Sequence, residues 1–222
     1  MKQFVLISFA TEKYYAQQER LVQSANQINE FNKIISFREI DIDSTFYNKN
    51  KHILSQPRGA GFWLWKPYFL LKTMDAFKEN DIILYLDCHH IIHNKYLAFI
   101  LKNIFHDCFF VMSENLQKEW TKRDCFVEMN CDNEHFYNST QLEAGICAFR
   151  KSMSSVGFLK LWLQYCENEN ILTDKPNVCG LDNLKEFIDH RHDQSILTNL
   201  YHKYALSSVW SAINANYIGE GR

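Results

Sequence analysis

The sequence predicts an α/β protein with a mostly parallel central sheet flanked by helices. The first indication is an unbroken apolar run at 82–86, which is typical of a strand buried on both faces of a parallel sheet. The second is the order of a strand at 4–9, a helix and a strand at 34–42, since such units usually pair in parallel. A further apolar run at 141–150 predicts another central strand.

Length and composition favour one domain spanning residues 1–222. The chain has 222 residues, of which 46% are hydrophobic, and this is enough for a sizeable core. No low-complexity linker marks a boundary. The formal net charge of −2, without a long basic run, argues against a protein that binds nucleic acid by bulk electrostatics.

Cysteine usage and hydropathy predict a soluble, cytoplasmic protein. The 7 cysteines are odd in number and include no C-x-x-C pair, so neither a disulfide framework nor a structural zinc site is expected. The amino-terminal apolar stretch is too short for a signal peptide, and no run approaches the roughly 18 apolar residues of a membrane-spanning helix. Peripheral contact with the inner face of a membrane stays open, as does the oligomeric state.

The first strand and its neighbour supply polar groups at their carboxyl ends. Ser8, Phe9 and Ala10 lie at the end of the first strand, and Asp41 and Asp43 end the second. The helix between them has an apolar face at i, i+4 and i+7. No glycine-rich fingerprint follows the first strand, so a dinucleotide-binding or phosphate-loop interpretation has little support.

A dense cluster of Arg, Gly, Trp and Lys follows a polar segment at 44–57, which we expect to be a loop. Gly61 lets a backbone approach a ligand closely, Trp65 offers a flat face to a base or sugar, and Arg58 and Lys66 suit phosphate oxygens. The alternative is that the tryptophans are core and the glycines form a tight turn. Pro67 then fits the first turn of a helix.

The strand at 82–86 carries Tyr85 and leads directly into Asp87 and His89. Ligands of open α/β sheets bind beyond the carboxyl ends of the strands. Asp87 and His89 are two residues apart, so on an extended chain they point to the same side and are able to share one metal ion. The alternative is a strand that ends in a polar loop.

The second half of the chain brings two more polar clusters. After a helix at 96–105 and a strand at 108–112, the polar and aromatic stretch at 114–140 has no clear period and is expected to cover a site. The strand at 141–150 is entered through Glu143 and Gly145.

Two helices complete the predicted order. One is expected to begin near Ser154 and Ser155, which are good caps. The last has His192, Asp193 and Gln194 at its start, where Asp193 or Ser195 is able to act as a cap.

Among reaction classes, a nucleotide-sugar site fits these clusters best. A metal hydrolase lacks an HxxxH helix with a general-base Glu, and the adjacent His89 and His90 would diverge on a strand. A nucleophilic triad lacks a GxSxG elbow. A nucleotide-sugar donor needs its diphosphate neutralised, which a divalent ion and Arg or Lys can do. Oxygen ligands suit Mg²⁺ or Mn²⁺, and an imidazole shifts the preference toward Mn²⁺.

Four motifs, in order, resemble small bacterial glycosyltransferases of the GT-A type. They are the WKP-containing stretch at 58–67, Tyr-Leu-Asp-x-His at 85–89, Glu-Ala-Gly at 143–145 and His-Asp-Gln-Ser at 192–195. The order is also similar to that of the glycogenin and lipopolysaccharide galactosyltransferase group, which carries Leu-Asp-x-Asp, then Asn-x-Gly, then Asp-Gln. The resemblance implies a GT-A-like, Rossmann-type fold with a nucleotide-binding half at 1–113 and an acceptor-side half at 114–222.

The resemblance also implies roles for individual residues. Asp87 takes the place of the first Asp of the Asp-x-Asp motif and His89 that of the metal-binding second Asp. Glu143, Asp193 and Gln194 are the expected catalytic residues, and Asp87 and His89 the expected ligands of Mn²⁺ or Mg²⁺. The residues expected to bind the nucleotide sugar are Ser8, Phe9, Ala10, Asp41, Arg58, Gly61, Trp65, Lys66, Tyr85, Asp87, Gly145 and His192, with Asp43 as an alternative to Asp41.

The implied activity is transfer of a sugar, with UDP as the favoured nucleotide, to a hydroxyl of a glycan such as lipopolysaccharide or capsule. A retaining, hexosyltransferase-like outcome is slightly favoured, and Glu143 or Asp193 would serve as base in an inverting enzyme. His89 departs from the motif, and the His-x-x-Gly-x-Lys segment of the glycogenin-like group is absent. A non-catalytic nucleotide-sugar binding module or partner subunit is therefore the main alternative, and a nucleotidyltransferase the third.

Overall fold

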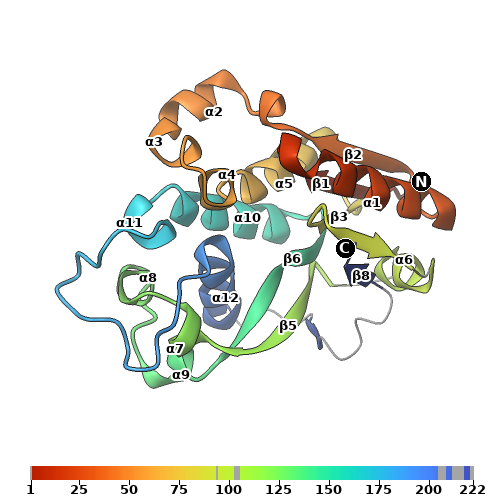
Figure 1. The fold of residues 1–222 in the computed structure, drawn as a ribbon. Coiled ribbons are helices and arrows are strands. Elements are labelled where there is room, and N and C mark those ends of the chain that lie inside the picture. The colour runs from red at the N-terminus through yellow and green to blue at the C-terminus, as the bar shows by residue number, and fades with distance from the viewer. Residues whose placement is uncertain (1, 94, 103–105, 205–208, 212–217, 221–222) are drawn as a thin grey trace.

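A mixed sheet forms the centre of the computed structural model (Figure 1), which describes residues 2–93, 95–102, 106–204, 209–211 and 218–220. Within these residues the sheet has six strands in the order β2-β1-β3-β6-β5-β7. The strands are β1 (Phe4–Phe9), β2 (Lys33–Phe37), β3 (Ile82–Leu86), β5 (Cys108–Leu116), β6 (Thr140–Arg150) and β7 (Val209–Ser211). A separate pair joins β4 (His90–Ile92) to β8 (Ile218–Glu220).

All strands of the sheet except β6 run in the same direction. β1 pairs in parallel with β2 and β3, and β5 pairs in parallel with β7, whereas β6 is antiparallel to both β3 and β5. The mostly parallel sheet predicted from the sequence is confirmed. Because β6 is reversed, its amino-terminal half lies at the edge where β3 ends, and the clusters at 87–89 and 143–145 meet there.

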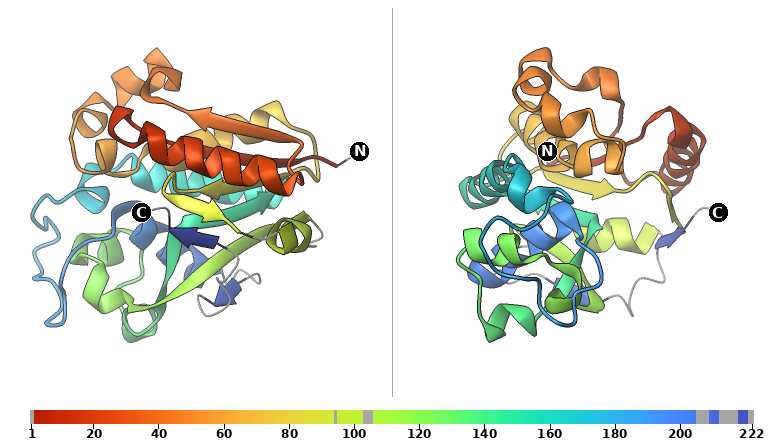
Figure 2. Two further views of the ribbon diagram at one scale, coloured as in Figure 1. Left: turned by 45° about the vertical axis from the view of Figure 1, so that its right-hand side comes forward. Right: turned by 60° about the vertical axis from the view of Figure 1, so that its left-hand side comes forward.

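Helices cover both faces of the sheet (Figures 1 and 2). Alternate residues of β1 and β3 enter two different cores: Phe4 and Leu6 pack with α1 and α6, whereas Val5 and Ile7 pack with α5, α10 and α12. This alternation explains why the strands are continuously apolar. The five helices are α1 (Tyr15–Ile28), α5 (Trp65–Ala76), α6 (Lys95–Lys102), α10 (Met153–Cys166) and α12 (His192–Tyr204).

Short helices form in two segments for which the sequence predicted no regular structure. The segment at 44–57 contains α2 (Ser44–Lys49) and α3 (Lys51–Leu54), which bury Ile53 and Leu54. The segment at 114–140 contains α7 (Gln117–Trp120), α8 (Arg123–Glu128) and α9 (Glu134–Tyr137). The loop predicted at 44–57 was wrong, because helices of four to six residues are too short to show a hydrophobic period. That the segment at 114–140 covers a site stays a prediction.

Several boundaries also differ from prediction. The second strand ends at Phe37 rather than 42, because the Asp41 carboxylate accepts the Arg38 N–H at 2.7 Å and turns the chain into the short helix η2 (Glu39–Asp41). The strand predicted at 108–112 continues to Leu116 as β5. The helix predicted at 96–105 is α6, and residues 103–105 lie outside the described chain.

The helix starts are closer to prediction. The cap of α10 is Ser152, and Ser155 completes the box three residues later. Pro67 lies in the first turn of α5, as predicted.

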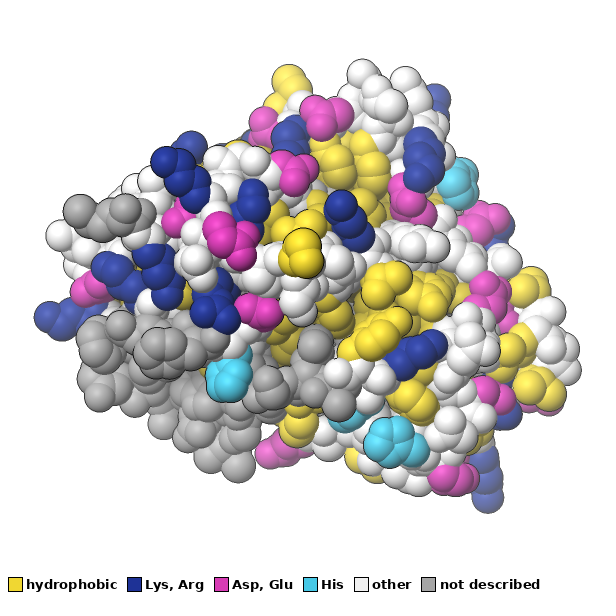
Figure 3. All heavy atoms as spheres, turned by 180° about the vertical axis from the view of Figure 1, so that it is seen from behind, with side chains coloured by type: hydrophobic (Ala, Val, Ile, Leu, Met, Phe, Trp, Pro, Cys, Tyr) yellow, Lys and Arg dark blue, Asp and Glu magenta, His cyan; other side chains and the backbone are white. Residues whose placement is uncertain are grey.

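Two surface properties agree with the sequence analysis. Seen from behind (Figure 3), basic and acidic side chains are interspersed, as the small net charge suggests. No helix among the described residues is long and apolar enough to cross a membrane.

Candidate active site

A buried lysine links the polar clusters that the sequence singled out. Lys66, in the first turn of α5, has 2% of its side chain exposed. Its Nζ lies 3.1 Å from Asp193 Oδ2 and 3.6 Å from Asp87 Oδ1. A buried ammonium needs such partners, because removing it from water is otherwise very costly. The fold thus brings three predicted residues from distant parts of the chain into one ion cluster.

Aromatic rings surround the lysine. Its Nζ lies 5.1 Å from the centre of the Tyr85 ring and 5.8 Å from that of Trp65. Phe9 stacks on Trp65 with ring centres 4.0 Å apart, and the Trp65 indole N–H donates to the Gly59 carbonyl at 2.9 Å. Trp65 is therefore a core residue that packs beside Lys66. This agrees with the alternative interpretation given above, in which the tryptophans belong to the core.

A left-handed turn sets the position of Lys66. Residues 59–63 all have positive φ, including the non-glycine residues Ala60, Phe62 and Trp63, each of which costs roughly 1–2 kcal/mol in this conformation. A Cβ on Gly61 would lie 2.6 Å from Leu54 Cα, and one on Gly59 would lie 2.4 Å from the Trp63 ring. The glycine backbone does approach another group closely, as predicted, but these groups are Leu54 and Trp63 of the protein and not a ligand.

Asp87 follows β3 and is held from several sides. The Tyr85 hydroxyl donates to Oδ1, and the Asp87 N–H donates to the Gly145 carbonyl at 2.9 Å. Its side chain remains 23% exposed. Burial opposes ionisation, but the Lys66 charge and the Tyr85 hydroxyl outweigh it and lower the pKa of Asp87. The result is an ionised carboxylate, partly open to solvent, at the carboxyl end of a central strand.

Asp193 is the more deeply buried carboxylate, with 4% of its side chain exposed. Burial raises its pKa to about 6, although Lys66 acts in the opposite direction. Burial also works against the charge of Lys66, but Asp193 and Asp87 together raise the lysine pKa. At neutral pH the cluster therefore contains one positive and two negative charges.

The first turn of α12 is fastened to β6. The Gln194 side chain accepts from the Ala144 N–H at 3.2 Å and donates to Gln141 Oε1 at 2.7 Å. The Asp193 carbonyl accepts from the Trp162 indole N–H at 2.9 Å. These contacts place Asp193 and Gln194 beside the 143–145 motif. Gln141 was not predicted, although a glutamine in an apolar strand is a usable signal.

His192 begins α12 with a φ of 50° and is buried. Its Nδ1–H donates to the Leu172 carbonyl at 2.7 Å, and its ring lies 5.5 Å from that of Trp63. Burial lowers the pKa of the imidazole. His192 therefore connects the left-handed turn before α5 to the start of α12.

The remaining predicted residues lie outside the ion cluster. The Arg58 guanidinium is held by Asp174 at 3.0 Å and Asp189 at 2.6 Å, so its charge is already matched within the protein. Glu143 is half-buried on β6 opposite Val111. Ser8, Phe9 and Ala10 are buried at the end of β1, where Ser8 accepts from the Gln18 amide at 3.0 Å.

The predicted metal ligands lie two residues apart in the chain, but they do not form a complete cage. His89 is half-buried, and its ring lies 4.4 Å from that of His90. Across the described part of the chain, no three His, Cys, Asp or Glu side chains are placed to hold one metal ion. Asp87 and His89 therefore fit a divalent ion only if a substrate supplies further oxygen ligands, as phosphates commonly do.

Comparison with known proteins identifies the fold. No family model matches the sequence, and no curated protein sequence matches it either. Among solved structures, the bifunctional glycosyltransferase WbbM is 12% identical with a TM-score of 0.55, covering 94% of this chain. This chain corresponds to 39% of the length of WbbM.

Two further structures are similar at lower scores. The galactosyltransferase LgtC, solved with donor and acceptor sugar analogs, is 13% identical over 94% of this chain and 73% of its own, with a TM-score of 0.49. Mouse xyloside xylosyltransferase 1 is 10% identical over 94% of this chain and 84% of its own, also at 0.49. From the WbbM match and the sheet order, the chain has a GT-A-like glycosyltransferase fold.

Proposed function

We propose that this protein is a glycosyltransferase that moves a sugar from a nucleotide diphosphate, with UDP favoured, to a hydroxyl of a glycan. The observation that carries the proposal is the position of Asp87. It is an ionised, partly exposed carboxylate at the carboxyl end of β3, fixed by Lys66 and Tyr85 beside Gly145. In open α/β sheets this edge is where ligands bind.

The charge of the cluster supports a donor that binds together with a cation. The positive charge of Lys66 faces the two negative charges of Asp87 and Asp193, so the net charge of the three side chains is −1 at neutral pH. A bare diphosphate would be repelled, whereas a divalent ion would be attracted. We propose that Asp87 and His89 hold Mn²⁺ or Mg²⁺ jointly with the donor phosphates. The bound ion would neutralise charge on the diphosphate leaving group.

The remaining residues are assigned by their place around this cluster. Asp193 fixes Lys66, and Gln194 lies beside the 143–145 motif, so we propose both next to the transferred sugar. A retaining outcome is favoured on the resemblance, and Glu143 would serve as base in an inverting reaction. The end of β1 (Ser8, Phe9 and Ala10) and Asp41 would lie near the nucleoside, with the nucleotide half at 1–113.

The setting we propose is the synthesis of a bacterial surface glycan, on the cytoplasmic side of the membrane. The acceptor half would be 114–222. The resemblance of the four motifs supports both proposals, and the GT-A-like fold is compatible with them.

Hydrolysis of UDP-sugars tests the proposal even when the acceptor is unidentified, because water takes the place of the acceptor. A panel of UDP-hexoses with Mn²⁺ would be followed for UDP release in the wild type, Asp87→Asn and Asp132→Asn. Asp132 is a matched control, because it too is paired with a cation, Arg123, and accepts from a tyrosine, Tyr137. We expect Asp87→Asn alone to lose at least 90% of the activity, and equal activity in both variants would reject the role of Asp87.

A non-catalytic nucleotide-sugar binding module is the second candidate. It is favoured by one observation, that His89 stands where the family motif has a second carboxylate. Calorimetry of UDP with and without Mn²⁺ separates the two functions when it is combined with the hydrolysis assay. Binding without hydrolysis of any donor, or transfer to any acceptor tried, would favour the module.

A further inference from the structure

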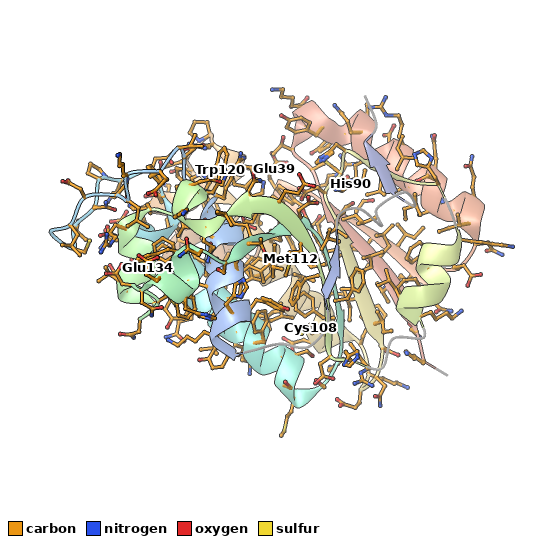
Figure 4. The ribbon with its side chains drawn as sticks, turned by 90° about the horizontal axis from the view of Figure 1, so that it is seen from below. Glu39, His90, Cys108, Met112, Trp120 and Glu134 are labelled. Carbon is orange, nitrogen blue, oxygen red and sulfur yellow. The ribbon has the colours of Figure 1, made fainter. Side chains whose placement is uncertain are left out.

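An arginine–tryptophan pair lies beside the candidate active site and has no role in the function proposed above. The Arg191 guanidinium lies over the Trp120 ring, 4.1 Å from its centre. Trp120 ends α7 and is half-buried, whereas Arg191 directly precedes α12 and is exposed. Figure 4 labels both Trp120 and His90, and His90 begins β4 three residues after Asp87.

Arg191 differs from the described arginines 58, 123 and 150 in having no carboxylate partner. Arg123 is paired with Asp132 and Arg150 with Asp107, and Arg58 packs its guanidinium between Asp174 and Asp189. Within the described residues, Arg191 forms no ion pair. Its stacking on Trp120 uses the flat face of the guanidinium and leaves the edge with its N–H donors available.

Hydrogen bonds fasten this pair to the turn that carries Asp193. The Trp120 carbonyl accepts from the Arg191 N–H at 3.0 Å and from the Ser195 hydroxyl at 2.8 Å. It also accepts from the Gln141 amide at 3.3 Å, and Gln141 is bonded to Gln194. The backbone of Arg191 is therefore held against Trp120, and Arg191 lies two residues before Asp193 in the chain.

We propose that Arg191, oriented by Trp120, binds an anionic group on the acceptor glycan. A guanidinium edge suits a carboxylate or phosphate, which it can bind through two parallel hydrogen bonds. The ligand would be a sugar with a carboxylate or phosphate substituent, placed next to Asp193 and on the acceptor-side half of the fold. The identification of this ligand as an acceptor rests on the proposed function, whereas binding of the anionic sugar does not.

Three small sugars distinguish the possible anions. Methyl β-D-glucuronide carries a carboxylate, glucose 6-phosphate carries a phosphate, and methyl β-D-glucoside is neutral. Their dissociation constants would be measured by NMR titration at low salt in the wild type. We expect one of the anionic sugars to bind about tenfold more tightly than the glucoside, as one charge-assisted contact allows. The preferred anion then identifies the substituent.

Three variants test whether the preference for an anionic sugar depends on Arg191 and Trp120. Arg191→Gln should abolish the preference for the anionic sugar, and Trp120→Ala should weaken it, whereas Trp120→Phe should retain most of it. Lys160→Gln is the control, since it removes one exposed positive charge from α10 without touching the pair. The melting temperature and UDP affinity of each variant would be measured in parallel.

The outcomes separate this inference from the proposed function. Equal binding of all three sugars by the wild type, or an unchanged preference in Arg191→Gln, would overturn the anionic subsite. Loss of the preference in Lys160→Gln as well would also overturn it, because the effect would then follow net charge. A protein that shows the Arg191-dependent preference but does not bind UDP would retain the subsite and contradict the glycosyltransferase proposal.

Discussion

Gly145 lies directly against Asp87. The Asp87 N–H donates to the Gly145 carbonyl at 2.9 Å, and a Cβ on Gly145 would stand 2.9 Å from Asp87 Oδ2. Gly145 has no positive φ, so its backbone would accept a side chain, and only the carboxylate stands in the way. The reversed strand β6 therefore leaves room for Asp87 by carrying no side chain at this position.

Gly145→Ala should displace the Asp87 carboxylate while the fold is retained. We expect UDP-sugar hydrolysis to fall at least tenfold, with a change in unfolding free energy of about 1 kcal/mol. Gly157→Ala is the matched control, because a Cβ there meets nothing within 4 Å and Gly157 lies inside α10. The control should gain roughly 0.5–1 kcal/mol of stability and keep its activity. Full activity in Gly145→Ala would show that the position of Asp87 does not matter.

Lys66→Met should strongly destabilise the protein. It leaves Asp87 and Asp193 without their shared cation, and removing one partner of a buried ion pair typically costs about 3–5 kcal/mol. Lys72→Met removes a lysine from the exposed pair with Asp43, whose side chain is 63% exposed, so a loss of about 0–1 kcal/mol is expected. Urea unfolding at pH 7 measures both. Similar losses in the two variants would mean that the Lys66 cluster is not buried in solution.

Asp193 should titrate close to pH 6. Burial raises its pKa from 3.8 to about 6, so folding favours the protonated form. Protonated Asp193 therefore adds to the free energy of unfolding. This contribution is fully present below pH 3.8 and is lost as the pH rises to about 6. At 1.36 kcal/mol per pKa unit, the loss is up to roughly 3 kcal/mol. Carbon NMR of the Asp193 carboxyl should show the midpoint, and Asp193→Asn should lack this part of the pH dependence in urea unfolding. A midpoint below 4 would contradict the burial of this carboxylate.

Gly61→Ala should disturb the turn that places Lys66. The residue has a φ of 92°, and the added Cβ would lie 2.6 Å from Leu54 Cα, so both strain and a backbone clash result. We expect a loss of more than about 2 kcal/mol in unfolding free energy. Gly180→Ala is the control for strain alone, because Gly180 has a φ of 77° and open space around it. Equal melting temperatures for the two variants would rule out the clash.

The sequence was sufficient to predict the long elements and the edge where the polar clusters meet. Apolar runs identify β1, β3 and β6, because these strands are buried on both faces of the sheet. The residues at Asp87, Gly145 and Asp193 were expected near one another on the motif order, and the structure brings them together. Short helices such as α2 and α7 were missed, since six and four residues are too few for a measurable period.

The partners within the site were less predictable. Lys66 was expected to meet phosphates, yet its neighbours are two carboxylates. This pairing depends on the left-handed turn before α5, which brings Lys66 next to Asp193 at the start of α12. Arg58 likewise has its charge matched by Asp174 and Asp189, more than a hundred residues away in the chain. Sequence spacing carries no information about such long-range pairing, whereas Tyr85 and Asp87, two residues apart, could be paired by strand alternation.

The most direct test of the central claim is a crystal structure of the protein with UDP and Mn²⁺, with anomalous data collected at the manganese edge. The account predicts the nucleotide at the carboxyl ends of β1 and β3, with the diphosphate and a manganese peak beside Asp87. A nucleotide bound away from this edge, or an edge that stays empty at saturating UDP and Mn²⁺, would contradict it.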